Sequence, residues 1–186
     1  MSEYSEVVRS TILDAAEQTL RRTSFYIKPQ VWMLCEDMEQ PVAGYLTCRD
    51  FRRGADAAKA IGDLGLFPSQ LAATRLIVAW EDVDLRTALE LPGEPYAHAY
   101  VTLEASFTDH VLHWHPFEQE ETDIPNEIRL PTVTPHWGTP ARYENVPLLP
   151  PIQHLLDVWR ELRGGDMWET ARAQEGSGYR LVMFQR

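Results

Sequence analysis

The stretch Leu76-Ile77-Val78-Ala79-Trp80 decides the fold class of this chain. It is a continuous apolar run, rich in β-branched residues and flanked on both sides by charge. Such residues favour strands, and an unbroken apolar run indicates a strand covered on both faces. We therefore place this strand at the centre of a sheet.

A second strand signal precedes it. Residues 31–35 are apolar at both odd and even positions, residues 36–41 are polar and turn-like, and residues 42–48 are again apolar. This pattern predicts a β-hairpin. With a turn near Glu39 and Gln40, Cys35 and Cys48 lie several residues out of register, too far apart for a disulfide. We expect two buried free thiols, a reducing compartment and a cytoplasmic protein.

Helical periodicity marks the segments around these strands. Apolar residues recur at helical spacing in residues 5–22 and in residues 152–162, and an alanine-rich helix is expected over residues 55–64. Residues 97–105 and 110–117 read as an antiparallel hairpin, and residues 179–184 as a last strand. No internal repeat and no apolar run of membrane-spanning length occurs in the sequence.

A proline-rich segment separates the hairpin from the last helix. Residues 125–151 contain seven prolines. We expect that density to exclude regular strand pairing and to favour an extended arm laid over the body or against a second subunit.

These elements predict an α+β fold: a mixed, mainly antiparallel sheet with helices packed on it, and the proline-rich arm before the C-terminal helix. We expect a core domain at residues 1–124, the arm at residues 125–151, and a helix and strand at residues 152–186 that complete the same domain. The early order of elements resembles the roadblock or profilin-like regulatory domains in topology alone.

Charge limits the classes of partner. The 186 residues include 28 acidic and 17 basic side chains, which gives a net charge of −11. Binding to a phosphate backbone draws on clustered Lys and Arg, and here the basic residues are scattered. The sequence therefore argues against nucleic acid and against a membrane surface, and it favours a protein partner or self-association.

The strongest candidate for a chemical site in the sequence is the stretch His113-Trp114-His115-Pro116. Alternate residues of a strand share a face, so His113 and His115 point the same way, and the expected hairpin places Glu104 roughly opposite His113. Two imidazoles and a carboxylate are suitable ligands for zinc. The fragment resembles the His-x-His-Pro motif of the MPN/JAMM-type metalloisopeptidases, although Thr122 and Pro125 stand where that family has Ser and Asp. The alternative is a pair of histidines on a partly solvated sheet face.

Other candidate sites have simpler interpretations. Glu81, Asp82 and Asp84 follow the central strand and either bind Mg²⁺ or cap the next helix. Neither cysteine stands beside a histidine, and the sequence contains no nucleophile elbow and no phosphate-binding loop.

We therefore expect a non-enzymatic accessory or protein–protein interaction module with no cofactor. Trp137, Tyr143, Trp159 and Trp168 are candidate interface anchors, since large aromatic residues are enriched at binding hot spots. Two alternatives remain. One is a zinc-dependent hydrolase that uses Glu104, His113 and His115, and the other is an acidic inhibitor of a basic protein surface.

Overall fold

The computed structural model describes residues 3–22, 27–93, 97–122, 132–161 and 164–184. Its helices are α1 (Glu3–Arg22), α2 (Ala55–Gly62), the 3-10 turn η1 (Asp63–Gly65), α3 (Leu66–Leu71), α4 (Asp82–Ala88), α5 (Pro150–Arg160) and α6 (Met167–Gly176). Its strands are β1 (Gln30–Leu34), β2 (Val42–Thr47), β3 (Arg75–Glu81), β4 (Ala99–Ala105), β5 (His110–Thr122), β6 (Thr132–Trp137), β7 (Ala141–Glu144) and β8 (Arg180–Met183).

The described residues form one eight-stranded sheet in the order β6-β5-β4-β3-β1-β2-β8, with β7 paired to β5. Every described strand pairing is antiparallel. The run Leu76–Trp80 lies in β3, between β1 and β4, and it is fully or almost fully buried, as expected of a central strand. The predicted α+β class with helices packed on a mainly antiparallel sheet is confirmed.

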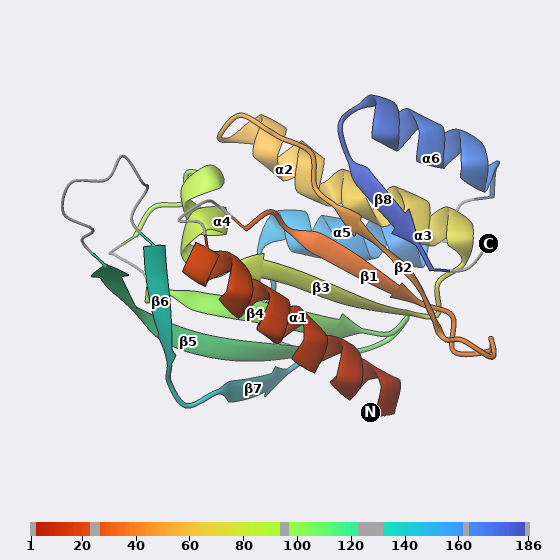
Figure 1. Ribbon diagram of the computed structural model, residues 1–186. Coiled ribbons are helices and arrows are strands. Elements are labelled where there is room, and N and C mark those ends of the chain that lie inside the picture. Colours follow the sequence, from red (N-terminus) through yellow and green to blue (C-terminus); the bar gives the residue numbers. More distant parts are fainter. Residues whose placement is uncertain (1–2, 23–26, 94–96, 123–131, 162–163, 185–186) are drawn as a thin grey trace.

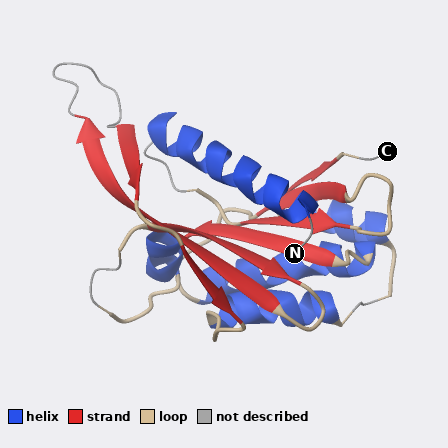
Figure 2. Ribbon diagram, turned by 90° about the horizontal axis from the view of Figure 1, so that it is seen from below, coloured by secondary structure: helices blue, strands red, loops and turns tan. Residues whose placement is uncertain are grey.

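The two faces of the sheet are covered unequally. Helices α2, α3 and α5 lie on one face, whereas α1 crosses the other face by itself among the described helices (Figures 1 and 2). The larger apolar cluster lies between the sheet and α2, α3 and α5, and it includes Ile61, Phe67, Leu155 and Trp159. The smaller cluster lies under α1, where Val8 and Ile12 meet the other face. Helix α1 packs over β3, β4 and β6 and leaves β2 and β8 uncovered.

The first hairpin forms as predicted, with a different register. Met33 pairs with Gly44 and Leu34 with Val42, because the strand pairing shifts between Met33 and Leu34. Cys35 and Cys48 are both buried and free. Burial raises the pKa of the Cys48 thiol to about 12, which keeps it protonated at neutral pH.

The expectation that the prolines exclude regular pairing is wrong. Within the described part of residues 125–151, β6 and β7 both pair with β5, and Pro135 itself lies opposite Gln119. Strand β6 has β5 as its single strand neighbour in the described chain, and an edge strand tolerates a residue that lacks an N–H group. Residues 125–131 of the predicted arm lie outside the described residues.

Among the described helices, none combines the length and the apolar character that crossing a membrane requires.

Trp159 tests how the larger cluster contributes to stability. Its side chain is 0% exposed, and its indole N–H donates a 2.8 Å hydrogen bond to the carbonyl oxygen of Ala73. We expect Trp159→Ala to lower the free energy of unfolding by about 3–5 kcal/mol, because it leaves a cavity and an unpaired carbonyl. Urea denaturation measures this. The matched control Trp168→Ala removes a side chain that is 57% exposed and should change stability by less than about 0.5 kcal/mol. Equal effects of the two substitutions would contradict the packing described.

Candidate functional site

The predicted metal ligands lie on the sheet face under α1. The β4–β5 register pairs Thr102 with His113, whereas Glu104 lies opposite Val111. The expectation that Glu104 faces His113 is therefore wrong by one step along the same face. The cause is the connection at residues 106–109, where the amide of Ser106 donates to the carbonyl oxygen of Asp109 and aligns Ala105 with His110.

The carboxylate of Glu104 is buried and paired with two arginines, so it is not free to bind a ligand. It is 4% exposed, its Oε1 accepts a 3.0 Å hydrogen bond from Arg75, and its Oε2 lies 3.6 Å from a guanidinium nitrogen of Arg9. A buried carboxylate requires such cations, since desolvation without them is costly. Arg75 also binds Glu36, so three side chains join the turn after β1 to β3 and β4.

His113 belongs to the same polar cluster. Its Nε2 lies within hydrogen-bond distance of the Arg9 guanidinium, and its ring stacks on that of His115. Because arginine only donates, His113 accepts here and is neutral. Burial, with Arg9 as a second cause, lowers the pKa of His113 to about 4 and also lowers the pKa of His115. These contacts attach α1 to β4 and β5.

This arrangement does not assemble the zinc site that the sequence suggested. Within the described residues, no group of three or more His, Cys, Asp or Glu side chains is arranged to hold a metal ion. The two guanidinium groups at Glu104 also place positive charge where a cation would sit. The residues do share one face, and their chemistry there is that of an ion-pair cluster.

The acids that follow β3 cap a helix. Glu81 is the N-cap of α4 and accepts a 2.6 Å hydrogen bond from the amide of Asp84. Asp82 accepts from Arg86 and from the indole of Trp80. Burial raises the pKa of both Glu81 and Asp84. Helix capping thus accounts for Glu81, and the contacts with Arg86 and Trp80 account for Asp82.

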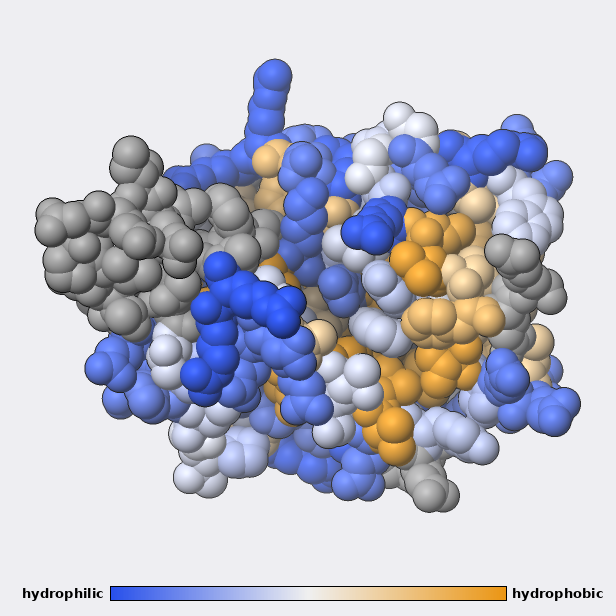
Figure 3. Space-filling view, in the orientation of Figure 1, coloured by the Kyte–Doolittle hydropathy of each residue, from blue (hydrophilic) through white to orange (hydrophobic). Residues whose placement is uncertain are grey.

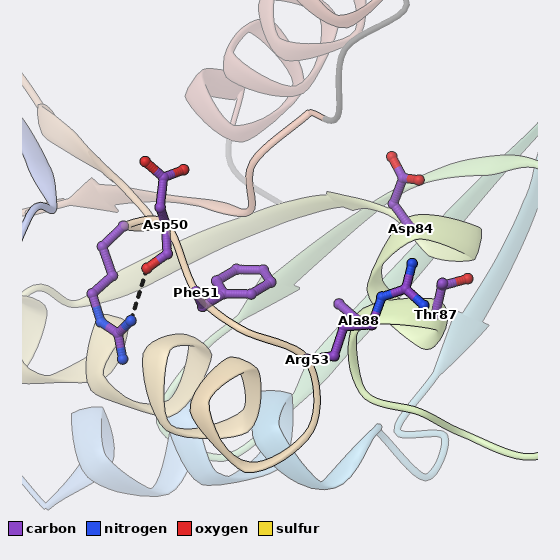
Figure 4. A pocket seen from close by; sticks show the side chains of 7 residues that line it. Asp50, Phe51, Arg53, Asp84, Thr87 and Ala88 are labelled. Atoms are coloured by element: carbon purple, nitrogen blue, oxygen red, sulfur yellow. Dashed lines mark hydrogen bonds between the residues drawn. The ribbon is translucent and has the colours of Figure 1, made fainter.

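A pocket of about 320 Å³ lies between the start of α2 and α4 (Figure 4). The ring of Phe51 lies at its middle, with Asp50 on one side and Arg53 and Asp84 on the other. Lys28 pairs with Asp50 at 2.7 Å, and Arg49 pairs with Asp56. The pocket is lined by Arg49, Asp50, Phe51, Arg53, Asp84, Thr87 and Ala88. These residues provide charge but no nucleophile with an adjacent base.

The four predicted interface anchors have different environments. Trp159 is part of the core, so its assignment to an interface is corrected. Trp137 packs on Phe117, and its indole donates to Glu17 of α1 at 2.9 Å, which lowers the pKa of that carboxyl. Trp168 and Tyr143 are 57% and 47% exposed, on α6 and β7 respectively. Helix α6 packs on α3, on the side of the sheet away from α1, so Trp168 is remote from the sheet face on which α1 lies.

An aromatic face that the sequence interpretation missed is the most distinctive surface. Trp32 and Tyr45 are paired across β1 and β2 and stack with their ring centroids 4.7 Å apart. Phe184, 50% exposed, lies within about 6 Å of both rings. With Val42 and Val182 they form what we call the aromatic face, on the same side of the sheet as α1. Figure 3 shows apolar side chains gathered over the region of β1, β2 and β8.

Comparison with known proteins gives no identity. No family model, no curated protein and no solved structure matches this chain. The resemblances to roadblock or profilin-like domains and to metalloisopeptidases therefore find no support from relatives, and the aromatic face is the observation that carries a functional argument.

The low pKa of His113 makes a prediction about acid stability. The unfolded histidine takes up a proton near pH 6.5 and the folded one near pH 4, so the unfolded state binds more protons between these values. Stability should fall as the pH drops through this window. We expect His113→Gln, which keeps an acceptor for Arg9 but does not titrate, to lose about 1 kcal/mol less than the original chain between pH 7 and pH 4, since partial exposure reduces the full effect. Urea unfolding at both pH values measures the difference. The exposed His136, changed to Gln, is the control, and identical pH profiles for all three proteins would refute the assignment.

The ion-pair cluster also makes a prediction about zinc. Because Arg9 and Arg75 occupy the carboxylate of Glu104, we expect titration of the purified chain with ZnCl₂ at pH 7 to show no binding that depends on His113 and His115. Isothermal titration calorimetry compares the chain with the variant His113→Ala/His115→Ala. One equivalent of zinc bound by the former and lost in the latter would restore the hydrolase hypothesis.

Proposed function

We propose that this chain is a non-enzymatic protein-interaction module whose binding surface is the aromatic face. The observation that carries the proposal is the stacked Trp32–Tyr45–Phe184 group on the uncovered half of a sheet face, in which Phe184 is exposed and Trp32 and Tyr45 are half-buried. A stacked aromatic group outside the core is unusual for a surface that meets only water, and Trp and Tyr are enriched at binding hot spots.

The charge of the chain supports a protein partner. A net charge of −11 opposes binding to phosphate backbones and to anionic lipid, and it favours a partner of basic or mixed charge. The acidic-inhibitor hypothesis is therefore a special case of this proposal, in which the partner is a basic protein. Two buried free thiols support a reducing compartment, so we propose that the module works in the cytoplasm.

The contacts of Glu104 and His113 with arginines in the cluster under α1 do not favour the alternative of a zinc hydrolase. Self-association stays a prediction, which size-exclusion chromatography with light scattering tests directly.

Site-specific crosslinking tests the proposed surface. With p-benzoylphenylalanine in place of Tyr45, and in a second protein in place of Trp168, we expect a discrete adduct from Tyr45 alone in the cells that naturally make the chain. The partner is identified by mass spectrometry, purified and titrated. Tyr45→Ala should then weaken its binding at least about tenfold, as removal of a hot-spot side chain does, while Trp168→Ala should leave it unchanged. A partner bound equally well by both variants would show that the aromatic face is not the site.

A further inference from the structure

The space beside α1 has the width of one helix. The uncovered part of this face spans β2, β8 and the Trp32 side of β1, whose Leu34 is buried, and two to three strands measure about 10–14 Å across. A helix with its side chains is about 10 Å wide and packs about 8–10 Å from a neighbouring helix. One helix placed next to α1 would therefore complete the layer that α1 begins (Figure 1).

The flank of α1 that borders this space is partly apolar. Arg9 contacts His113, and Leu13 lies with His115 and Trp137, so that flank of α1 faces β5 and β6. Tyr4, 52% exposed, lies on the opposite flank by helical geometry, whereas Val7, 60% exposed, points away from the sheet. A helix in the empty position would contact this flank as well as the aromatic face.

The charges at the two ends of the face differ in sign. Strand β1 leads into the turn that contains Glu36, Asp37 and Glu39, all exposed, and Phe184 lies at that end because its amide donates to the carbonyl oxygen of Ala43. The opposite end carries Arg180, which is exposed and pairs in register with Thr47.

Helix α1 shows the same polarity. Its exposed Glu6 lies in the half that contacts Glu104 and, through Arg75, the acidic turn, whereas Arg21 and Arg22 lie in its last turn. The face is thus acidic at the end of the β1–β2 turn and basic at the end of Arg180.

We propose that the occupant of the aromatic face is an amphipathic helix of a partner protein, oriented parallel to α1. Its apolar stripe covers Trp32, Tyr45 and Phe184, its basic N-terminal end lies at the acidic turn, and its acidic C-terminal end lies at Arg180. The positive end of the helix dipole then meets acids and the negative end meets a base. This inference rests on the proposed function and specifies its partner.

Two model peptides test the orientation. Both are 20-residue amphipathic helices with the same leucine stripe and composition, labelled for fluorescence anisotropy. The first carries Lys in its first two turns and Glu in its last two, and the second has the reverse order. In isolation the second peptide forms the more stable helix, because its charges complement its own dipole. Tighter binding of the first peptide therefore cannot be explained by its intrinsic helicity.

We expect the chain to bind the Lys-first peptide at least tenfold more tightly than the Glu-first peptide. The variant Asp37→Lys/Glu39→Lys/Arg180→Glu should reverse this preference. Tyr45→Ala and, independently, Phe184→Ala should weaken the binding of the Lys-first peptide about tenfold, whereas the control Trp168→Ala should not change it. Circular dichroism confirms that each variant is folded.

Three results would overturn the proposal. The first is equal binding of both peptides or a preference for the Glu-first peptide. The second is binding that is insensitive to both Tyr45→Ala and Phe184→Ala. The third is a dimer, seen by light scattering, that these substitutions dissociate, which would assign the face to a second copy of the chain. Each leaves the proposed function in place if crosslinking at Tyr45 still identifies a partner, and failure of both experiments removes both proposals.

Discussion

A sheet has two faces, and apolar side chains on either face gain stability only when another layer covers them. This chain supplies α2, α3 and α5 for one face and a single described helix, α1, for the other. The fully covered face contains most of the large buried side chains and determines stability. The half-covered face leaves the aromatic group partly exposed next to α1. Unequal coverage of one sheet therefore accounts for both the core and the proposed site.

The position of α1 on its face is fixed by charge as well as by apolar contact. Val8 and Ile12 bury apolar surface, which attracts the helix to the sheet without selecting one alignment. Arg9 adds direction, because it meets Glu104 and His113 on two adjacent strands. If the helix slid towards β1 and β2, Arg9 would leave Glu104, and a buried charge without its partner would destabilise the fold. The cluster therefore holds α1 in its position on the sheet. The apparent metal ligands thus determine where the uncovered surface begins.

The sequence predicted elements governed by local pattern and failed where partners distant in the chain decide the outcome. The strand at Leu76–Trp80, the helix at residues 5–22 and both hairpins follow from periodicity. Pro135 pairs in a strand because the edge of β5 away from β4 is open to β6, which the prolines themselves do not reveal. The partner of Glu104 depended on the exact pairing across the turn: because Ala105 pairs with His110, Glu104 lies opposite Val111, two residues from His113. Apolar residues at both parities of β1 indicated a strand covered on both faces and hid the fact that one face stays half open.

The alternation of side chains along β1 separates binding from stability. Val31 and Met33 are fully buried in the larger cluster, whereas Trp32 between them points to the other face and is only half-buried. The same parity in β2 directs Leu46 into the core and Tyr45 outward to Val182 of β8. Because the aromatic face shares its strands but not its side chains with the larger cluster, its residues can change with the needs of a partner while the packing of that cluster is preserved. A surface built in this way meets the structural requirement for a recognition site on a stable scaffold, whereas His113 under α1 gives its Nε2 to Arg9 and so belongs to the ion-pair cluster that positions the helix.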